Sequence, residues 1–116
     1  MVVSQKYQNK KIAIYGMGIT GCSAAKAFKR LKAKLFCWDD NKTIRKKIKN
    51  LKFPLSKFWL NKKLIDTIVI SPGIDINKCK IRNYLKKNLS KIITDLDLFF
   101  ELNKNALIIS ITGTNG

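Results

Sequence analysis

The chain has 116 residues, of which 46% are hydrophobic, and it carries a formal net charge of +17; this length suits one compact domain with a moderate core. It contains no histidine, which excludes a Ser-His-Asp triad and a histidine-ligated zinc site. No apolar stretch approaches the ~20 residues needed to cross a bilayer, and the N-terminus lacks the apolar core of a signal peptide, so we expect a cytoplasmic protein without a membrane partner.

Strand-forming runs alternate with amphipathic stretches in the first half of the chain. Residues 11–15 predict a strand, residues 20–31 a helix, and residues 33–38 a second strand. A helical segment then follows until Pro54 ends it. The stretch at residues 53–64 is ambiguous between a short strand and a loop.

The second half continues the same alternation. Its predicted elements are a strand at residues 65–71, a helix at 77–87, a short strand at 91–94, a short helix at 96–103 and a last strand at 106–112. Alternating strands and helices are typical of βαβ units. The sequence therefore predicts an α/β fold, a Rossmann-like and mostly parallel sheet with flanking helices.

Three glycines follow the first predicted strand in the motif GMGITG. The spacing of Gly16, Gly18 and Gly21 allows a tight turn, close approach of the backbone to an anionic phosphate, and close packing of the next helix on the strand. Asp39 and Asp40 end the second strand, about 20 residues further on, where a Rossmann acid meets a ribose or a base. A tight turn with capping aspartates is the alternative interpretation.

Two further loops follow predicted strands. Ser71-Pro72-Gly73 opens at the same carboxyl edge of a parallel sheet as GMGITG, so both loops could line one crevice; an ordinary turn explains this tripeptide equally well. The motif TGTNG at residues 112–116 resembles the beginning of a phosphate-binding loop, without the lysine and the Ser/Thr that would contact phosphates and Mg²⁺.

Taken in order, GMGITGCS, ISPGI and ITGTNG resemble the N-terminal part of the Mur ligase family, and within it the ligases that add D-glutamate. The resemblance implies that residues 1–105 form a Rossmann-like domain that binds a UDP-sugar, UDP-N-acetylmuramoyl-L-alanine. It also implies that residues 106–116 are the first strand and partial phosphate loop of a central ATPase domain. D-glutamate would bind to a further domain.

The resemblance also assigns residues by position. The implied UDP-sugar contacts are Gly18, Ile19 and Thr20 near the diphosphate, Asp39 and Asp40 near the uracil, and Ser71, Pro72 and Gly73 in the uridine pocket; the implied ATP contacts are Gly113, Thr114, Asn115 and Gly116. This chain has Asp40-Asn41 where a well-known member of the family has Thr-Arg, so the substrate contact implied for that arginine is in doubt. We expect a lysine such as Lys42 to compensate.

The implied reaction consumes ATP with Mg²⁺. The carboxylate of the UDP-sugar becomes an acyl phosphate, and the amine of D-glutamate attacks it to form an amide. We expect no catalytic residue and no metal ligand in these 116 residues, and no ATP or Mg²⁺ held stably by them. We therefore expect an inactive UDP-sugar binder. Separately, we expect it to be a monomer.

Two other functions remain as alternatives. A nicotinamide-dependent oxidoreductase would use GMGITG and Asp39 in the same way, although that fold does not need a TGTNG motif. A nucleic-acid partner is suggested by the net charge alone. Nearly all the cations are lysines spread along the chain, whereas specific readers favour clustered arginines, and we expect no nucleic-acid partner.

Overall fold

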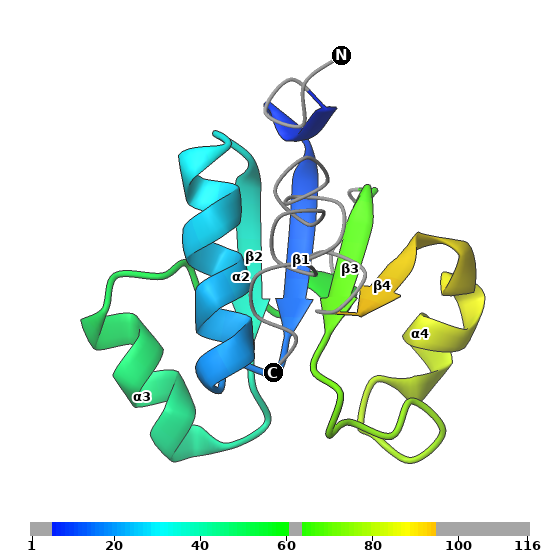
Figure 1. Cartoon of the computed structure of the whole chain (residues 1–116). Helices are drawn as coiled ribbons and strands as arrows, with labels where there is room; N and C mark the ends of the chain where they lie inside the picture. The colour runs from blue at the N-terminus through cyan, green and yellow to red at the C-terminus, as the bar shows by residue number, and fades with distance from the viewer. Residues whose placement is uncertain (1–5, 61–63, 95–116) are drawn as a thin grey trace, which may run out of the picture.

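The computed structural model describes residues 6–60 and 64–94, which build a four-stranded parallel sheet between two helical layers (Figure 1). The strands are β1 (Lys11–Tyr15), β2 (Lys34–Trp38), β3 (Thr67–Ile70) and β4 (Ile92–Thr94). Their order in the sheet is β2-β1-β3-β4. Tyr15 is paired with Trp38 and with Ile70, so the carboxyl ends of the three longest strands lie level. The α/β fold and the parallel sheet predicted from the sequence are confirmed.

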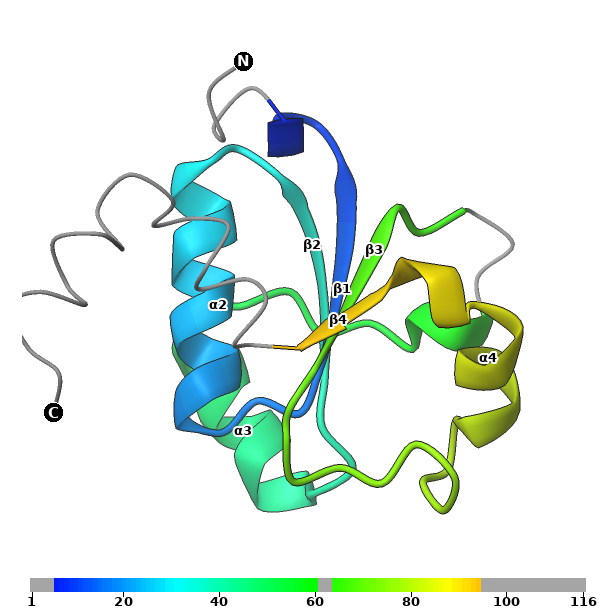
Figure 2. The ribbon, with the colours of Figure 1, turned by 45° about the vertical axis from the view of Figure 1, so that its right-hand side comes forward.

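Helices cover both faces of the sheet. They are α2 (Ile19–Arg30), α3 (Lys42–Asn50) and α4 (Arg82–Lys87), with 3₁₀ turns at Phe58–Leu60 and Leu89–Lys91. Helices α2 and α3 lie on one side of the sheet and α4 on the other (Figure 2). Within residues 6–60 and 64–94, no helix is long and apolar enough to cross a membrane.

The alternation of side chains along the strands explains why the sheet is covered on both faces. In β1, Ile12 and Ile14 pack into the core beneath α2 and α3, with Phe28 of α2. Ala13 and Tyr15 pack into the opposite core. Successive strand residues point to opposite faces, and a parallel sheet buries both. An almost continuous apolar run such as KIAIY therefore suits a central strand.

Most elements begin and end close to their predicted limits, but the helix predicted at residues 77–87 is wrong over residues 77–81. In the structure this helix begins only at Arg82. The side chain of Asp75 accepts a hydrogen bond from the backbone N–H of Asn77 at 2.8 Å, and its carbonyl accepts one from Lys78 at 3.1 Å. The carbonyl of Asp75 also accepts from the backbone N–H of Cys79 at 3.0 Å, and the carbonyl of Cys79 accepts from that of Arg82 at 3.2 Å. Two separate turns therefore precede α4 in place of one continuous helix.

The ambiguous stretch at residues 53–64 makes no extended strand among its described residues. Leu55 forms an isolated parallel bridge with Cys37, and the 3₁₀ turn follows at Phe58–Leu60. The strand predicted at 65–71 is shortened to β3.

Several predictions fall outside the described residues. They are the helix at 96–103, the strand at 106–112, the partial phosphate loop at 113–116 and the domain boundary after residue 105.

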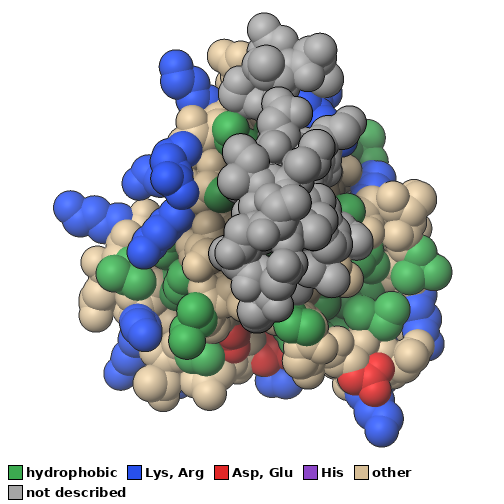
Figure 3. Space-filling view, in the orientation of Figure 1, with side chains coloured by type: hydrophobic (Ala, Val, Ile, Leu, Met, Phe, Trp, Pro, Cys, Tyr) green, Lys and Arg blue, Asp and Glu red, His purple; other side chains and the backbone are tan. Residues whose placement is uncertain are grey.

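The basic side chains visible in Figure 3 are spread around the margins of that face, with a larger group over α2. The acidic side chains visible there lie toward the lower end, to which the arrow of β1 points in Figure 1. The visible acidic side chains thus gather at the carboxyl edge of the sheet, where basic side chains lie beside them.

Candidate functional site

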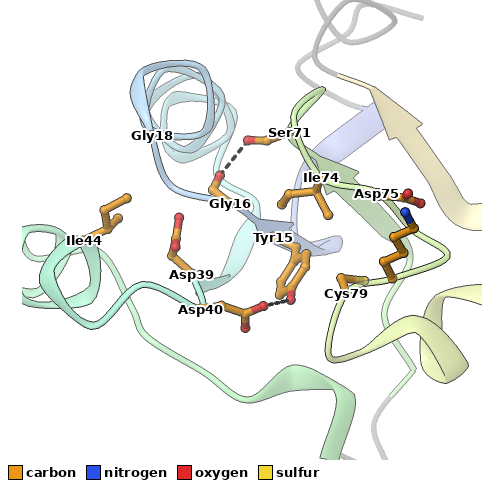
Figure 4. Close-up of a pocket in the computed structure, with 11 residues that line it drawn as sticks. Tyr15, Gly16, Gly18, Asp39, Asp40, Ile44, Ser71, Ile74, Asp75 and Cys79 are labelled. Carbon is orange, nitrogen blue, oxygen red and sulfur yellow. Dashed lines mark hydrogen bonds between the residues drawn. The ribbon is translucent and has the colours of Figure 1, made fainter.

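A pocket of about 430 Å³ lies at the carboxyl ends of β1, β2 and β3 (Figure 4). Its walls are formed by Tyr15, Gly16, Gly18, Asp39, Asp40, Ile44, Ser71, Ile74, Asp75, Lys78 and Cys79. The chain passes from β1 to β2 on one side and later to β3 on the other. Ligands of open α/β sheets bind at such a switch point, and this volume lies within the range of small-molecule sites.

Two of the three glycines in the first loop are required by the fold. Gly16 has a φ of +98°, and a Cβ there would lie 2.7 Å from the Ser71 side chain and 2.7 Å from Ile74. A Cβ on Gly21 would lie 1.9 Å from the carbonyl oxygen of Gly16. The tight turn and the close packing of α2 on the loop therefore depend on hydrogen in place of a side chain.

Gly18 differs from these two glycines. A Cβ at this position would meet nothing within 4 Å, and Gly18 lines the pocket as the N-cap of α2. No side chain of the described residues caps α2, and its first turn has no acidic residue. The amide groups and the dipole of this helix end are therefore available to an anion in the pocket.

Asp39 connects the first two loops. Its Oδ2 accepts a hydrogen bond from the backbone N–H of Met17 at 2.8 Å, and its Oδ1 accepts one from that of Asn41 at 2.8 Å. Arg45 of α3 donates to the carbonyl oxygen of Asp39 at 2.8 Å, and its guanidinium lies 4.7 Å from the centre of the Trp38 ring. These contacts fix the end of β2 against the glycine loop.

Asp40 lies one residue further and enters the pocket differently. Its Oδ2 accepts a hydrogen bond from the hydroxyl of Tyr15 (Figure 4). Tyr15 is almost fully buried, whereas Asp40 is exposed. Burial first, and then the hydrogen bond to Asp40, raise the pKa of Tyr15 well above its usual value. The phenol therefore stays a proton donor to this carboxylate throughout the physiological pH range.

The third loop is joined to the first through Ser71. Its hydroxyl donates to the carbonyl oxygen of Gly16 at 3.1 Å, and its backbone N–H donates to that of Tyr15 at 3.2 Å. Ile74 follows on the same wall, with Lys78 and Cys79 beyond it. The glycine loop and the Ser71 loop thus border one pocket.

The structure brings together only some of the residues singled out from the sequence. Gly18, Asp39, Asp40 and Ser71 line the pocket. Ile19, Thr20, Pro72 and Gly73 are exposed and do not line it. Gly113, Thr114, Asn115 and Gly116 lie outside the described residues. Lys42 begins α3 but is not on the pocket wall.

Sequence reasoning missed Tyr15 and Lys78 as pocket residues. Tyr15 ends β1 immediately before the glycine loop. A hydroxyl group at the end of an otherwise apolar strand is a sequence signal from which this pocket residue could have been found. Among the described residues, Lys78 is the basic residue that lines the pocket. Nothing in its sequence context distinguishes it from the neighbouring lysines.

Replacing Asp39 with asparagine should lower the free energy of unfolding by about 1.5–3 kcal/mol. The two carboxylate oxygens each accept a backbone N–H, whereas the amide has only one oxygen and leaves one of these N–H groups without its acceptor. Urea denaturation of Asp39→Asn and wild type measures this loss. Asp40→Asn is the matched control, since Asp40 is exposed and the variant keeps an oxygen for Tyr15. Equal stability of Asp39→Asn and wild type would contradict the structural role of Asp39.

Residues 10–93 match the family model described as "Mur ligase MurD-like, N-terminal domain". Curated relatives include the UDP-N-acetylmuramoylalanine--D-glutamate ligases of Rickettsia prowazekii (strain Madrid E) and Wolbachia pipientis wMel. They are 40% and 34% identical to this chain over 95% and 96% of its length, which corresponds to 25% and 23% of theirs. The chain therefore spans about a quarter of these relatives. No solved structure gives a significant match.

Proposed function

Because this chain belongs to the MurD-like Mur ligase family through its N-terminal domain, we propose that it binds UDP-N-acetylmuramoyl-L-alanine for a ligase that adds D-glutamate to this substrate in peptidoglycan biosynthesis. The observation that carries the proposal is the pocket at the carboxyl edge of the sheet, where the uncapped end of α2 faces acidic and apolar walls. These features suit the two parts of a sugar nucleotide.

The diphosphate would lie against the N-terminal end of α2. Gly18 supports this position, because the space where its side chain would be is open to the pocket. A phosphate there could approach the backbone closely and accept hydrogen bonds from the first-turn amides of Ile19 and Thr20. This gives these two residues a backbone role in binding, although their side chains do not line the pocket.

The nucleoside would occupy the space between the other two loops. Asp40 offers hydrogen-bond acceptors on one wall, and Ile44 and Ile74 offer apolar surface. Ser71, fixed to the glycine loop, would close the pocket beside the ribose or the base. A few polar groups within an apolar lining are typical of small-molecule sites.

The complete enzyme would use ATP and Mg²⁺ to convert the substrate carboxylate into an acyl phosphate with release of ADP, and the D-glutamate amine would displace the phosphate. Residues 113–116, to which an ATP contact is assigned by resemblance, lie outside the described residues. We assign the pocket described above to binding and orienting the UDP-sugar, and the chemical step to other parts of the complete enzyme.

Calorimetric titration of the chain with UDP-N-acetylmuramoyl-L-alanine and with NADH tests the proposal. We expect saturable binding of the UDP-sugar and of UDP, weaker binding of UMP because the second phosphate is missing, and no comparable binding of NADH. Binding of NADH without binding of either uridine diphosphate would overturn the proposal and favour a nicotinamide-dependent oxidoreductase.

A further inference from the structure

We propose that the outer lysines of α3, which are Lys42, Lys46 and Lys49, steer the anionic ligand toward the pocket and thereby set its rate of association. They act from outside the pocket and do not contact the bound ligand. The inference rests on the proposed function and deepens it, because it assigns the attraction of the UDP-sugar and its final contacts to different residues.

The pocket wall itself offers an approaching anion little attraction. It carries the carboxylates of Asp39, Asp40 and Asp75, and among the described residues Lys78 is its one cation. A nucleoside diphosphate is negatively charged as well, so the net charge of the wall repels it. The end of α2 attracts an anion only close to its first turn. Attraction over a longer range must therefore come from charges beside the pocket.

The outer face of α3 carries such charges. Lys42, Lys46 and Lys49 follow one another at i, i+4 and i+7, so they form one stripe along the helix. All three are exposed, and Ile44 and Ile48 pack into the core from the other side of the helix. No residue from 41 to 65 is acidic. The lysines of the stripe form no ion pair with any other described residue, so their charges are not neutralised by a partner.

The stripe begins beside the pocket. Ile44 lines the pocket, and it stands between Lys42 and Lys46 in the first turn and a half of α3. Lys49 lies about 10 Å along the helix from Lys42, at 1.5 Å per residue. Basic side chains are visible beside the acidic ones at this edge of the sheet (Figure 3). Exposed charges act over about 10 Å at an ionic strength of 0.1 M, which lets the stripe attract an anion near the pocket.

Arg45 of the same helix has a different role. Its guanidinium donates to the carbonyl oxygens of Asp39 and Asp40 at 2.8 and 2.9 Å and lies over the Trp38 ring. The loop therefore fixes the position of Arg45. An exposed lysine without such partners raises the local concentration of an anion but imposes no binding geometry. Lys42, which is not on the pocket wall, thus acts on the approaching ligand.

Titration of the ¹⁵N-labelled chain with UDP tests the inference, because line-shape analysis of the amide signals gives Kd and koff, and hence kon. At 0.1 M ionic strength the double variant Lys42→Gln/Lys46→Gln should lower kon about fivefold. Its koff should stay within about twofold of wild type, as is usual when charges at the rim of a site are removed. At 1 M ionic strength the loss of kon should fall below about twofold. UMP, which carries less charge than UDP, should lose less.

Lys10→Gln/Lys34→Gln is the matched control. It removes the same charge from two exposed side chains at the amino edge of the sheet, where Lys34 begins β2. A strand of five residues separates that edge from the carboxyl edge by about 13 Å or more, beyond the reach of an exposed charge at 0.1 M ionic strength. We expect kon of the control to stay within about 1.5-fold of wild type.

Two results would overturn the inference while UDP binding stays intact. Equal losses of kon in the two double variants would show that the net charge of the whole chain attracts the ligand. An unchanged kon in Lys42→Gln/Lys46→Gln would exclude steering by the stripe, and a raised koff would show that these lysines contact the bound ligand instead. A wild-type chain that does not bind UDP would overturn the proposed function as well.

Discussion

Replacing Gly21 with alanine is expected to unfold much of the protein or to lower its free energy of unfolding by about 3 kcal/mol or more. The new Cβ would lie 1.9 Å from the carbonyl oxygen of Gly16, and that atom belongs to the backbone. Relief would require α2 to move away from β1, and the pocket wall with it. Loss of a cooperative thermal transition, or a large fall in Tm, measures this effect.

Gly18→Ala is the control for that substitution. The residue stands three positions earlier in the same motif, has a negative φ of −71° and would place its Cβ in open space. We expect a change in unfolding free energy within about 0.5 kcal/mol. Similar destabilisation by both substitutions would contradict the packing described for the glycine loop.

Phe58→Ala should cost about 3–5 kcal/mol of unfolding free energy, as is usual for a fully buried phenylalanine. Phe58 lies in the core on the α4 side of the sheet, and its ring contacts those of Trp59 and Tyr84 at centre distances of 5.3 and 5.8 Å, edge-on. Tyr15 packs on it as well. Truncation would leave a cavity directly beneath the residue that holds Asp40. Urea denaturation measures the loss.

Leu60→Ala provides the comparison within the same 3₁₀ turn. The Leu60 side chain is 69% exposed, so its truncation should change the free energy of unfolding by less than about 0.5 kcal/mol. An effect of Phe58→Ala as small as that of Leu60→Ala would show that the turn does not anchor this face of the sheet.

The fold could be predicted because its signals are local. The apolar run at residues 11–15 and the glycines after it define a strand, a turn and a helix without reference to the rest of the chain. The start of α4 could not be predicted in this way, because the apolar spacing at residues 77–87 suits a helix. In the structure, hydrogen bonds to Asp75 and to the carbonyl of Cys79 close two separate turns before Arg82.

The candidate site was predictable in outline only. The loops with the glycines, the aspartates and Ser71 each follow a strand. Because the strands are parallel, the sequence alone places these loops at one edge of the sheet. The different hydrogen-bond partners of Asp39 and Asp40 could not be predicted, because they depend on the strand register that sets Tyr15 beside Trp38. That pairing brings the phenol at the end of β1 within reach of a carboxylate two residues beyond β2. Neighbouring aspartates in the sequence thus acquire different partners.

Amide chemical-shift mapping of the isotopically labelled chain with UDP tests most directly whether the pocket is a uridine diphosphate site. We predict saturable shifts at Gly18, Ile19 and Thr20, at Asp40 and at Ser71, with none of similar size for NADH at the same concentration. Shifts confined to residues away from the carboxyl ends of β1, β2 and β3, or the same shifts produced by NADH, would contradict the account.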